Sequence, residues 1–308
     1  MKVLISAIHY PVSAARFLAE GFRRLGHEVI TLGPTTGGMI PWGNGQDFSA
    51  YAWTPDVLLE PAPPIVEMPM KSIEDGRAYV EQIAPDLLVQ CDANLSLDGA
   101  SGVVPNVCWA VDNHVARYDD VPFDVVFGAH SWGYQSDKEN FVWLPCAYDP
   151  QSHYQIEGAF KHFDAAMIGV MYLQRKILLN ALAEHGSVLA GTGVLGERYN
   201  EAYNSARIAI VQSVCGDVPM RVFENAAQGL ALLVDRTERD LMRLGLEEGE
   251  HYLGYADPDE AVAQFQYLKK RAHVCERMAD RARRKLAQHT YEARAQTILD
   301  TCRQRGLL

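Results

Sequence analysis

Residues 216–229 read GDVPMRVFENAAQG, and the apolar run LALLV follows at residues 230–234. Asp217 is a good N-cap, Pro219 suits the first turn of a helix, and Gly229 suits its end. The stretch therefore predicts a short helix that runs into a buried strand, which is the repeating unit of an α/β protein.

The start of this helix, expected at residues 218–228, also has a chemical consequence. The first backbone N–H groups of a helix lack intrahelical partners and carry partial positive charge, which suits a phosphate group. Arg221 adds a cation on the first turn, and the Glu224 carboxylate one turn later can accept hydrogen bonds from two sugar hydroxyls. The pattern indicates a nucleotide-sugar site, and a capped surface helix with a salt bridge is the alternative.

Strand-like and helix-like segments alternate along the whole chain in two series. Strands are expected at residues 2–7, 29–32, 86–91, 105–111, 124–127, 164–170, 187–190, 207–211, 230–234 and 252–255. Helices are expected between them, including one at residues 238–244, and most of the chain after residue 259 is helical in pattern. This alternation predicts parallel sheets. No G-x-G-x-x-G motif follows the first strand, so the usual dinucleotide site is not expected there.

Polar side chains follow the strands of the first half. They are His9, Asp92, Asp112, His114 and His130. Ligands of open α/β sheets bind at the carboxyl ends of the strands, so we expect these side chains to share one rim. The Gly- and Pro-rich segment 33–69 also carries aromatic residues, which either stack on a sugar ring or fill the core under the loop. They are Trp42, Tyr51 and Trp53.

Small residues and cations follow the strands of the second half. The candidate binding set is Gly169, Arg175, Gly191, Thr192, Gly193, Ser213, Asp217, Met220, Arg221 and Glu224. Small residues allow the backbone to approach a base or a phosphate closely. Arg175 and Arg221 are expected to neutralise a diphosphate.

Composition and charge argue against several classes of protein. The chain has 308 residues and a formal net charge of −11, a balance that disfavours general binding to nucleic acid. No apolar run approaches the roughly 18–20 residues that span a bilayer, and the short apolar start is a first strand and not a signal peptide. The six cysteines are scattered without metal-ligand spacing, so we expect free thiols, no metal site and a cytoplasmic protein.

Several motifs together resemble the spore-coat CgeB-like glycosyltransferases, which are similar to the wider group of GT-B glycosyltransferases. The motifs lie at residues 144–150, 168–175, 203–209, 217–224, 251–255 and 289–294. The resemblance implies an α/β protein of GT-B type with two Rossmann-like domains facing across a cleft. It implies an acceptor domain at residues 1–150, a donor domain at 151–290, and a last helix at 291–308 that crosses back to the first domain.

The resemblance also implies a chemistry. A sugar moves from a nucleotide-diphosphate sugar to an acceptor hydroxyl without a metal or other cofactor, Glu224 binds the ribose, and Arg221 lies near the donor. Related retaining enzymes often carry a glutamate eight positions before the one matching Glu224. Here that position is Gly216 and its neighbour is Asp217, so Asp217 is a sugar ligand, a helix cap or both.

The acceptor side is less defined by the sequence. An inverting route needs a base, for which Asp112, His114 or His9 could serve, whereas a retaining route can use the leaving phosphate. The acceptor is open among a small molecule, a glycan, a protein and a modified DNA base. A nucleotide-sugar 2-epimerase and a non-catalytic nucleotide-sugar binding protein are the alternative functions.

Overall fold

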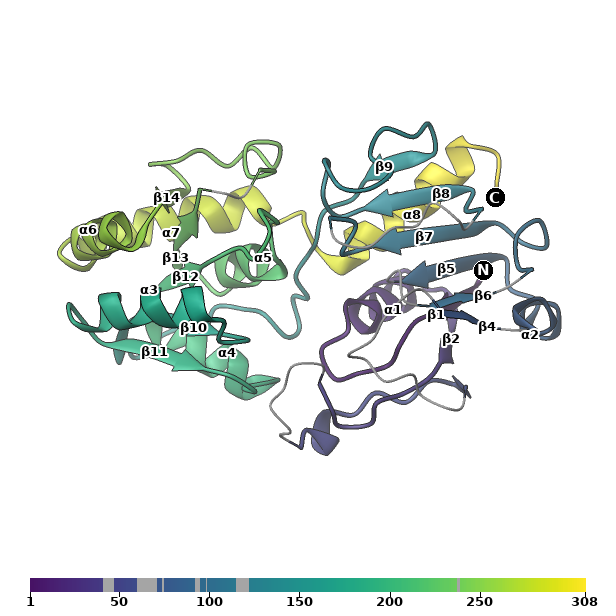
Figure 1. Cartoon of the computed structure of the whole chain (residues 1–308), viewed down its shortest axis with the longest axis horizontal. Coiled ribbons are helices and arrows are strands. Elements are labelled where there is room, and N and C mark those ends of the chain that lie inside the picture. Colours follow the sequence, from purple (N-terminus) through teal and green to yellow (C-terminus); the bar gives the residue numbers. More distant parts are fainter. Residues whose placement is uncertain are drawn as a thin grey trace. The chain divides into compact units, whose positions relative to one another are not determined.

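The computed structural model describes residues 1–40, 47–59, 71–73, 75–91, 95–97, 99–114, 122–236 and 239–308. Trp42 and Asp92 of the sequence analysis lie outside these ranges. The chain divides into two units, each with its own parallel sheet (Figure 1). Unit 1 comprises Met1–Pro145 and Tyr291–Leu308, and unit 2 comprises Cys146–Thr290. This first boundary lies slightly earlier in the chain than residue 150, where the sequence predicts it.

Unit 1 is built on a sheet of parallel strands in the order β3-β2-β1-β5-β7-β8-β9. Their bounds are β1 Lys2–Ser6, β2 Glu28–Gly33, β3 Val57–Leu58, β5 Leu87–Cys91, β7 Asn106–Ala110, β8 Val125–Gly128 and β9 Phe141–Trp143. A separate pair joins β4 (Lys71–Ile73) to β6 (Leu95–Leu97). The central strands β5, β7 and β8 are buried along their whole length, as their apolar runs require of parallel strands covered on both faces.

The helices of unit 1 come from both ends of the chain. They are α1 (Ala14–Arg24), α2 (Gly76–Ile83) and α8 (Tyr291–Gln304), with a 3-10 turn at Ser49–Tyr51. Helix α1 begins after Ser13, and the Ser13 side chain makes no capping hydrogen bond.

Helices α1 and α8 pack closely together. A Cβ on Gly21 of α1 would lie 2.6 Å from the carbonyl oxygen of Tyr291, so only glycine allows this approach. The Tyr291 ring is fully buried and contacts the rings of Phe17 and Trp109. Helix α8 is therefore part of the core of unit 1, although it follows unit 2 in the sequence.

Unit 2 repeats the same plan with strands in the order β11-β10-β12-β13-β14, all parallel. The strands are β10 Phe163–Ile168, β11 Val188–Gly191, β12 Ala206–Val211, β13 Ala231–Asp235 and β14 Tyr252–Tyr255. The helices are α3 Leu173–Ala183, α4 Glu197–Asn204, α5 Met220–Ala227, α6 Pro258–Lys269 and α7 Ala272–Leu286. Each unit is thus a Rossmann-like layer of parallel strands with helices, as the alternation in the sequence predicts.

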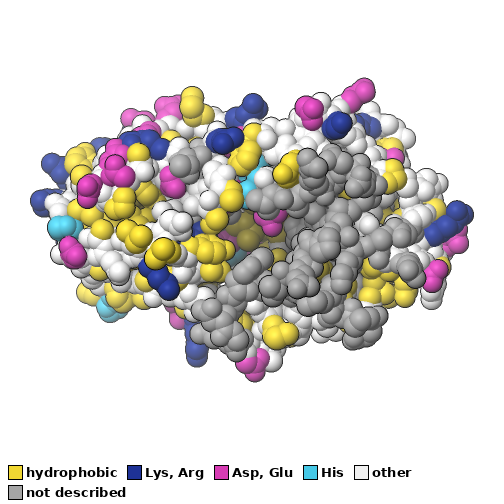
Figure 2. Space-filling view, in the orientation of Figure 1, with side chains coloured by type: hydrophobic (Ala, Val, Ile, Leu, Met, Phe, Trp, Pro, Cys, Tyr) yellow, Lys and Arg dark blue, Asp and Glu magenta, His cyan; other side chains and the backbone are white. Residues whose placement is uncertain are grey.

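Helix α3 shows how one helix divides its sides between core and surface. Leu178 and Leu182 are buried in the main core of unit 2 together with Phe265 of α6. Leu173 and Ile177 are exposed, and hydrophobic side chains gather on this face of unit 2 in Figure 2. The expected helix between β10 and β11 therefore carries apolar side chains on its exposed side as well as on its buried side.

The predicted helix at residues 238–244 is wrong over the part that the structure describes. Residues 239–245 form turns, with backbone hydrogen bonds from Leu244 to Asp240 and from Gly245 to Met242. Gly245 has a φ of +71° and ends the segment. The hydrogen bonds of a single turn do not offset the entropy cost of starting a helix. Leu241 and Leu244, which are spaced as on a helix, are therefore buried as residues of a turn.

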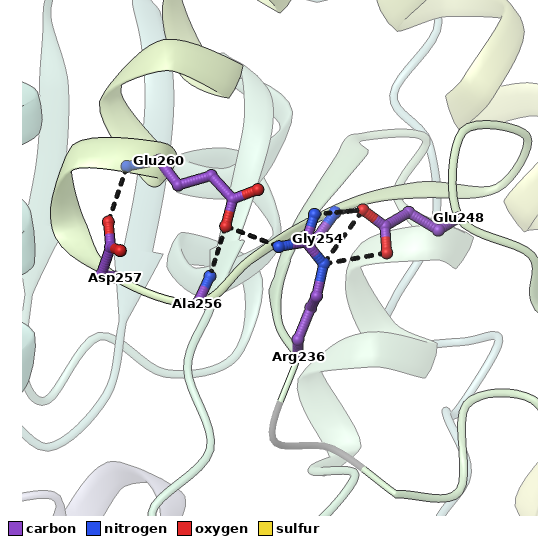
Figure 3. A network of polar contacts seen from close by, with 6 residues as sticks. All are labelled: Arg236, Glu248, Gly254, Ala256, Asp257 and Glu260. Atoms are coloured by element: carbon purple, nitrogen blue, oxygen red, sulfur yellow. Dashed lines mark hydrogen bonds and ion pairs between the residues drawn. The ribbon is translucent and has the colours of Figure 1, made fainter.

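A polar network joins the carboxyl ends of β13 and β14 (Figure 3). Arg236 follows β13 and donates to both oxygens of Glu248, at 2.6–3.2 Å, and to the carboxylate of Glu260. Asp257 caps α6 by accepting from the Glu260 N–H at 2.8 Å. The guanidinium of Arg236 lowers the pKa of both glutamates, so the network ties the last strands of the sheet to the start of α6.

Candidate functional site

The carboxyl ends of β10 and β11 are joined by hydrogen bonds around Gly169. The Gly169 N–H donates to the carbonyl of Gly191 at 2.9 Å, and the Thr192 hydroxyl donates to the Gly169 carbonyl at 2.9 Å. Gly193, which follows, has a φ of +76°, a conformation that favours glycine. The structure therefore brings together the predicted residues Gly169, Gly191, Thr192 and Gly193 at one edge of the sheet.

Arg221 reaches this edge from the first turn of α5. Its Nη1 donates to the carbonyl of Ile168 at 3.1 Å and fills the space that a Cβ on Gly169 would need. Gly169 also has a φ of +147°, so the position requires glycine on both counts. Burial works against the Arg221 charge, but the oxygens of Tyr203, Tyr199 and Glu224 hold its pKa above the ordinary value.

Arg175 is nearby, but its guanidinium binds the backbone. It is buried, and it donates from Nη1 to the Val170 carbonyl and from Nη2 to the Gln212 carbonyl, each at 2.8 Å. Burial, together with the charge of Arg221, lowers its pKa to about 10. Arg175 thus ties the end of β10 to the end of β12, a function that its sequence position did not indicate.

The prediction that Asp217 caps α5 is wrong. The helix begins at Met220 with Pro219 as the N-cap, and no side chain caps it. The Asp217 carboxylate turns back instead and accepts from the Ser213 hydroxyl at 3.0 Å and from the Val214 N–H at 3.2 Å. Because Pro219 occupies the N-cap, the acid two residues earlier closes the preceding loop.

Glu224 lies one turn into α5 and is buried, with 7% of its surface exposed. The Tyr199 hydroxyl donates to its Oε2 at 2.6 Å, and Nε2 of His153 lies 3.6 Å from its Oε1. Burial and the neighbouring Glu224 carboxylate raise the pKa of Tyr199, so its hydroxyl stays protonated and can donate. Sequence reasoning missed Tyr199 and His153, because neither position carries a local pattern that points to Glu224.

In unit 1 the residues after β7 and β8 come together. The buried Asn113 side chain donates to the His130 carbonyl at 2.8 Å and accepts from the His130 N–H at 2.9 Å. The His114 ring lies 4.4 Å from the His130 ring, centre to centre, and 5.9 Å from that of Trp132. Asp112, next to Asn113, is exposed. Adjacent parallel strands thus place Asp112, His114 and His130 at one edge, as expected.

His9 differs from this group. It follows β1, which β5 separates from β7 in the sheet, and its ring is fully buried 3.9 Å from that of Trp53. Burial lowers its pKa to about 4, although the backbone near Ala7 and Pro34 opposes the shift. A group with this pKa and no exposure is a weak proton acceptor near neutral pH, so Asp112 and His114 are the better candidates for a base.

Comparison with known proteins shows the class of enzyme. Residues 158–300, which include all the strand ends of unit 2, match the model of a family described as glycosyl transferase-like. The protein is a glycosyltransferase. A search among curated proteins found no match to the sequence.

Solved structures share the fold of this glycosyltransferase along its whole length. Sucrose-phosphate synthase from Thermosynechococcus elongatus has a TM-score of 0.69 at 12% identity, with 99% of this chain and 98% of that chain covered. AviGT4, a glycosyltransferase involved in avilamycin A biosynthesis, has a TM-score of 0.65 at 14% identity, with 99% and 97% covered. An α-glucosyltransferase in complex with UDP and DNA has a TM-score of 0.60 at 9% identity, with 98% of each chain covered. The fold is therefore of the GT-B type.

Other features of the glycosyltransferase concern membranes, metals and thiols. Within the described ranges, no helix is long and apolar enough to cross a bilayer. The same ranges hold no cluster of three or more His, Cys, Asp or Glu side chains suited to a metal ion. All six cysteines are free, and Cys215 beside the Asp217 loop is exposed whereas the others are buried.

Proposed function

We propose that this glycosyltransferase moves a sugar from a nucleotide-diphosphate sugar bound by unit 2 to a hydroxyl of an acceptor bound by unit 1. The single observation that carries the proposal is the arrangement on α5, where Arg221 and the buried Glu224 carboxylate follow the helix start by one turn or less. A cation on the first turn of a helix suits a diphosphate, and a carboxylate suits a pair of ribose hydroxyls. The motif resemblance to CgeB-like enzymes supports the same roles.

The proposed donor interactions do not require a metal ion. As the bond between the anomeric carbon and the phosphate oxygen breaks, negative charge builds on the leaving diphosphate. Arg221 and the N-terminus of α5 would stabilise that charge because they are in place before the reaction. A uridine nucleotide is the first donor to test, since one structural neighbour was solved with UDP.

The acceptor oxygen attacks the anomeric carbon and loses its proton. In an inverting reaction that proton would go to Asp112 or His114, which lie at the exposed edge of the unit 1 sheet. In a retaining reaction it would go to the leaving phosphate. The proposal places the reaction in the cytoplasm, where free thiols stay reduced.

Turnover of a donor panel tests the proposal. Nucleotide sugars with different bases are incubated with the protein, with and without pooled glycans, small hydroxylated molecules, proteins or duplex DNA that contains modified bases. Release of nucleoside diphosphate together with a heavier acceptor would support transfer. Conversion of the donor to its 2-epimer without acceptor would favour the epimerase, and donor binding without any turnover would favour the binding protein.

Substitutions then separate the proposed roles. Glu224→Gln should weaken donor binding, whereas Asp112→Ala or His114→Ala should lower kcat and leave donor affinity close to that of the wild type. Near-normal turnover in both acceptor-side variants would remove these two residues from the mechanism. Among the acceptors, duplex DNA has the weakest electrostatic support, because the net charge is −11.

A further inference from the structure

Both oxygens of the Glu224 carboxylate face a donor from another part of unit 2. The Tyr199 hydroxyl of α4 donates to Oε2 at 2.6 Å, and Nε2 of His153 faces Oε1 at 3.6 Å. His153 and Glu224 are both buried, with 6% and 7% of their surfaces exposed. The Tyr199 hydrogen bond to one oxygen and the buried His153 imidazole beside the other limit rotation of the carboxylate, because another orientation would break that hydrogen bond and move Oε1 away from His153.

The backbone at Asp149 determines which nitrogen of His153 carries the proton. The Asp149 N–H donates to Nδ1 of His153 at 3.2 Å, so Nδ1 acts as an acceptor. A neutral imidazole that accepts at Nδ1 carries its proton on Nε2, and that nitrogen faces Glu224. A tight turn sets this geometry, since the His153 N–H donates to the Asp149 carbonyl at 2.8 Å and the Ser152 hydroxyl donates to the Asp149 carboxylate at 2.7 Å.

Buried amides attach this turn to the helices that carry Tyr199 and Glu224. The Asn200 side chain on α4 accepts from the Tyr154 N–H at 3.2 Å and from Gln228, just after α5, at 3.0 Å. Asn204 accepts from the Ile156 N–H at 2.7 Å and donates to the Tyr154 carbonyl at 2.9 Å. The turn, α4 and α5 therefore hold a common position, so His153 and Tyr199 approach the carboxylate from fixed directions.

We propose that His153 and Tyr199 are positioning residues that aim the Glu224 carboxylate at the two hydroxyls of a ribose. The inference rests on the proposed function, in which Glu224 binds that sugar. The Tyr199 hydroxyl uses one lone pair of Oε2, and the His153 N–H lies on one side of Oε1 at 3.6 Å, so the other side of each oxygen keeps a fixed direction. Two fixed acceptors match the neighbouring 2′ and 3′ hydroxyls of a ribonucleotide, and a 2′-deoxyribose would leave one of them unpaired.

Calorimetry with nucleoside diphosphates tests this inference. ADP, GDP, CDP and UDP are titrated into the wild type, and the tightest of them is compared with its 2′-deoxy form. We expect the wild type to prefer the ribonucleotide by about tenfold or more, as one unpaired buried acceptor predicts. Tyr199→Phe and His153→Leu should reduce this preference to about threefold or less and leave affinity for the 2′-deoxy form nearly unchanged.

Conservative and distant variants complete the design. His153→Gln keeps an N–H donor at a similar reach and should restore most of the ribose preference. Tyr267→Phe and His273→Leu make the same chemical changes on exposed parts of α6 and α7, and both should match the wild type. Thermal unfolding of every variant shows whether it is folded.

The outcomes separate this inference from the proposed function. An unchanged ribose preference in Tyr199→Phe and His153→Leu would overturn the inference while the proposed function stands. Equal weakening of both nucleotides would also overturn it, because a purely structural role predicts that result. If the wild type binds none of the four nucleotides, the proposed function itself fails.

Discussion

Nη1 of Arg221 donates a hydrogen bond to the carbonyl oxygen of Ile168 at 3.1 Å. The contact joins the first turn of α5 to the last residue of β10, and it exists because the next residue, Gly169, has no side chain in the way. The position of the cation in the candidate donor site therefore depends on one glycine. This dependence gives the first prediction.

Gly169→Ala should displace the Arg221 guanidinium. The added Cβ would overlap with Nη1 of Arg221, and the φ of +147° is strained for any residue with a side chain. We expect the dissociation constant of the preferred nucleoside diphosphate to rise about tenfold or more in calorimetry, with a loss of about 1–3 kcal/mol in stability. Gly158→Ala is the control, since Gly158 has a φ of +72° but nothing within 4 Å of the added Cβ. Equal effects of the two substitutions would contradict the steric explanation.

Arg175→Met should lower the stability of the glycosyltransferase. The substitution keeps much of the buried side-chain volume but removes the hydrogen bonds to the carbonyls of Val170 and Gln212. Two partly buried carbonyls that lose their donors should cost about 1–3 kcal/mol in the free energy of unfolding, measured by urea denaturation. Lys176→Met on the exposed side of α3 should cost less than about 0.5 kcal/mol. A stability close to the wild type in Arg175→Met would show that these bonds are replaced by water.

His9 should make stability depend on pH between about 6.5 and 4. Burial lowers its folded-state pKa from 6.5 to about 4, so below pH 6.5 the unfolded state binds a proton that the folded state does not. Stability from this residue is therefore complete above pH 6.5, and about 3 kcal/mol is lost as the pH falls through that range. Chemical denaturation of the wild type and of His9→Phe at pH 7 and pH 4.5 measures the difference. If the stability of the two proteins changes equally with pH, His9 is not the source.

The network around Arg236 should stabilise unit 2 only slightly. Its side chains are about one-third exposed, so Glu248→Gln should cost about 1 kcal/mol or less at low salt and less still in 1 M NaCl. Because Arg236 lowers the pKa of Glu248, this stability is present above the ordinary glutamate pKa and is lost as the pH falls below it. Thermal unfolding in both salt concentrations gives the effect, and Glu247→Gln next to it is the matched control. A large loss that salt does not reduce would point to packing instead of charge.

The sequence predicted the fold well because strand and helix signals are local. The runs at residues 87–89 and 231–234 are apolar throughout, and their length and flanking residues distinguish buried strands from helices. The prediction of a helix at residues 238–244 is wrong because the segment is short. Only one turn of hydrogen bonds forms there. Periodicity shows which residues are buried, but it does not count how many turns a segment can complete.

The candidate site could be predicted only in part. Gly169, Arg221 and Glu224 were predicted because strand ends and helix starts have recognisable residue types, and the structure places Arg221 beside Gly169. The hydrogen-bond partners of Arg175 and Asp217 were not predicted. Arg175 donates to the backbone carbonyls of two loops, and Asp217 accepts from the loop that precedes it. Tyr199 and His153 lie far from Glu224 in the sequence, so no residue spacing predicts their contacts with it. These contacts depend on tertiary packing, which local sequence patterns do not contain.

Helix α8 also affects the order in which the protein can fold during synthesis. Unit 2 is continuous from Cys146 to Thr290, so all of it has left the ribosome before α8 emerges. Unit 1 lacks Tyr291 until then, and the ring surfaces of Phe17 and Trp109 that contact it are uncovered. The part of the protein made first is thus completed last, and a nascent chain must keep that apolar surface from aggregating while the second unit folds.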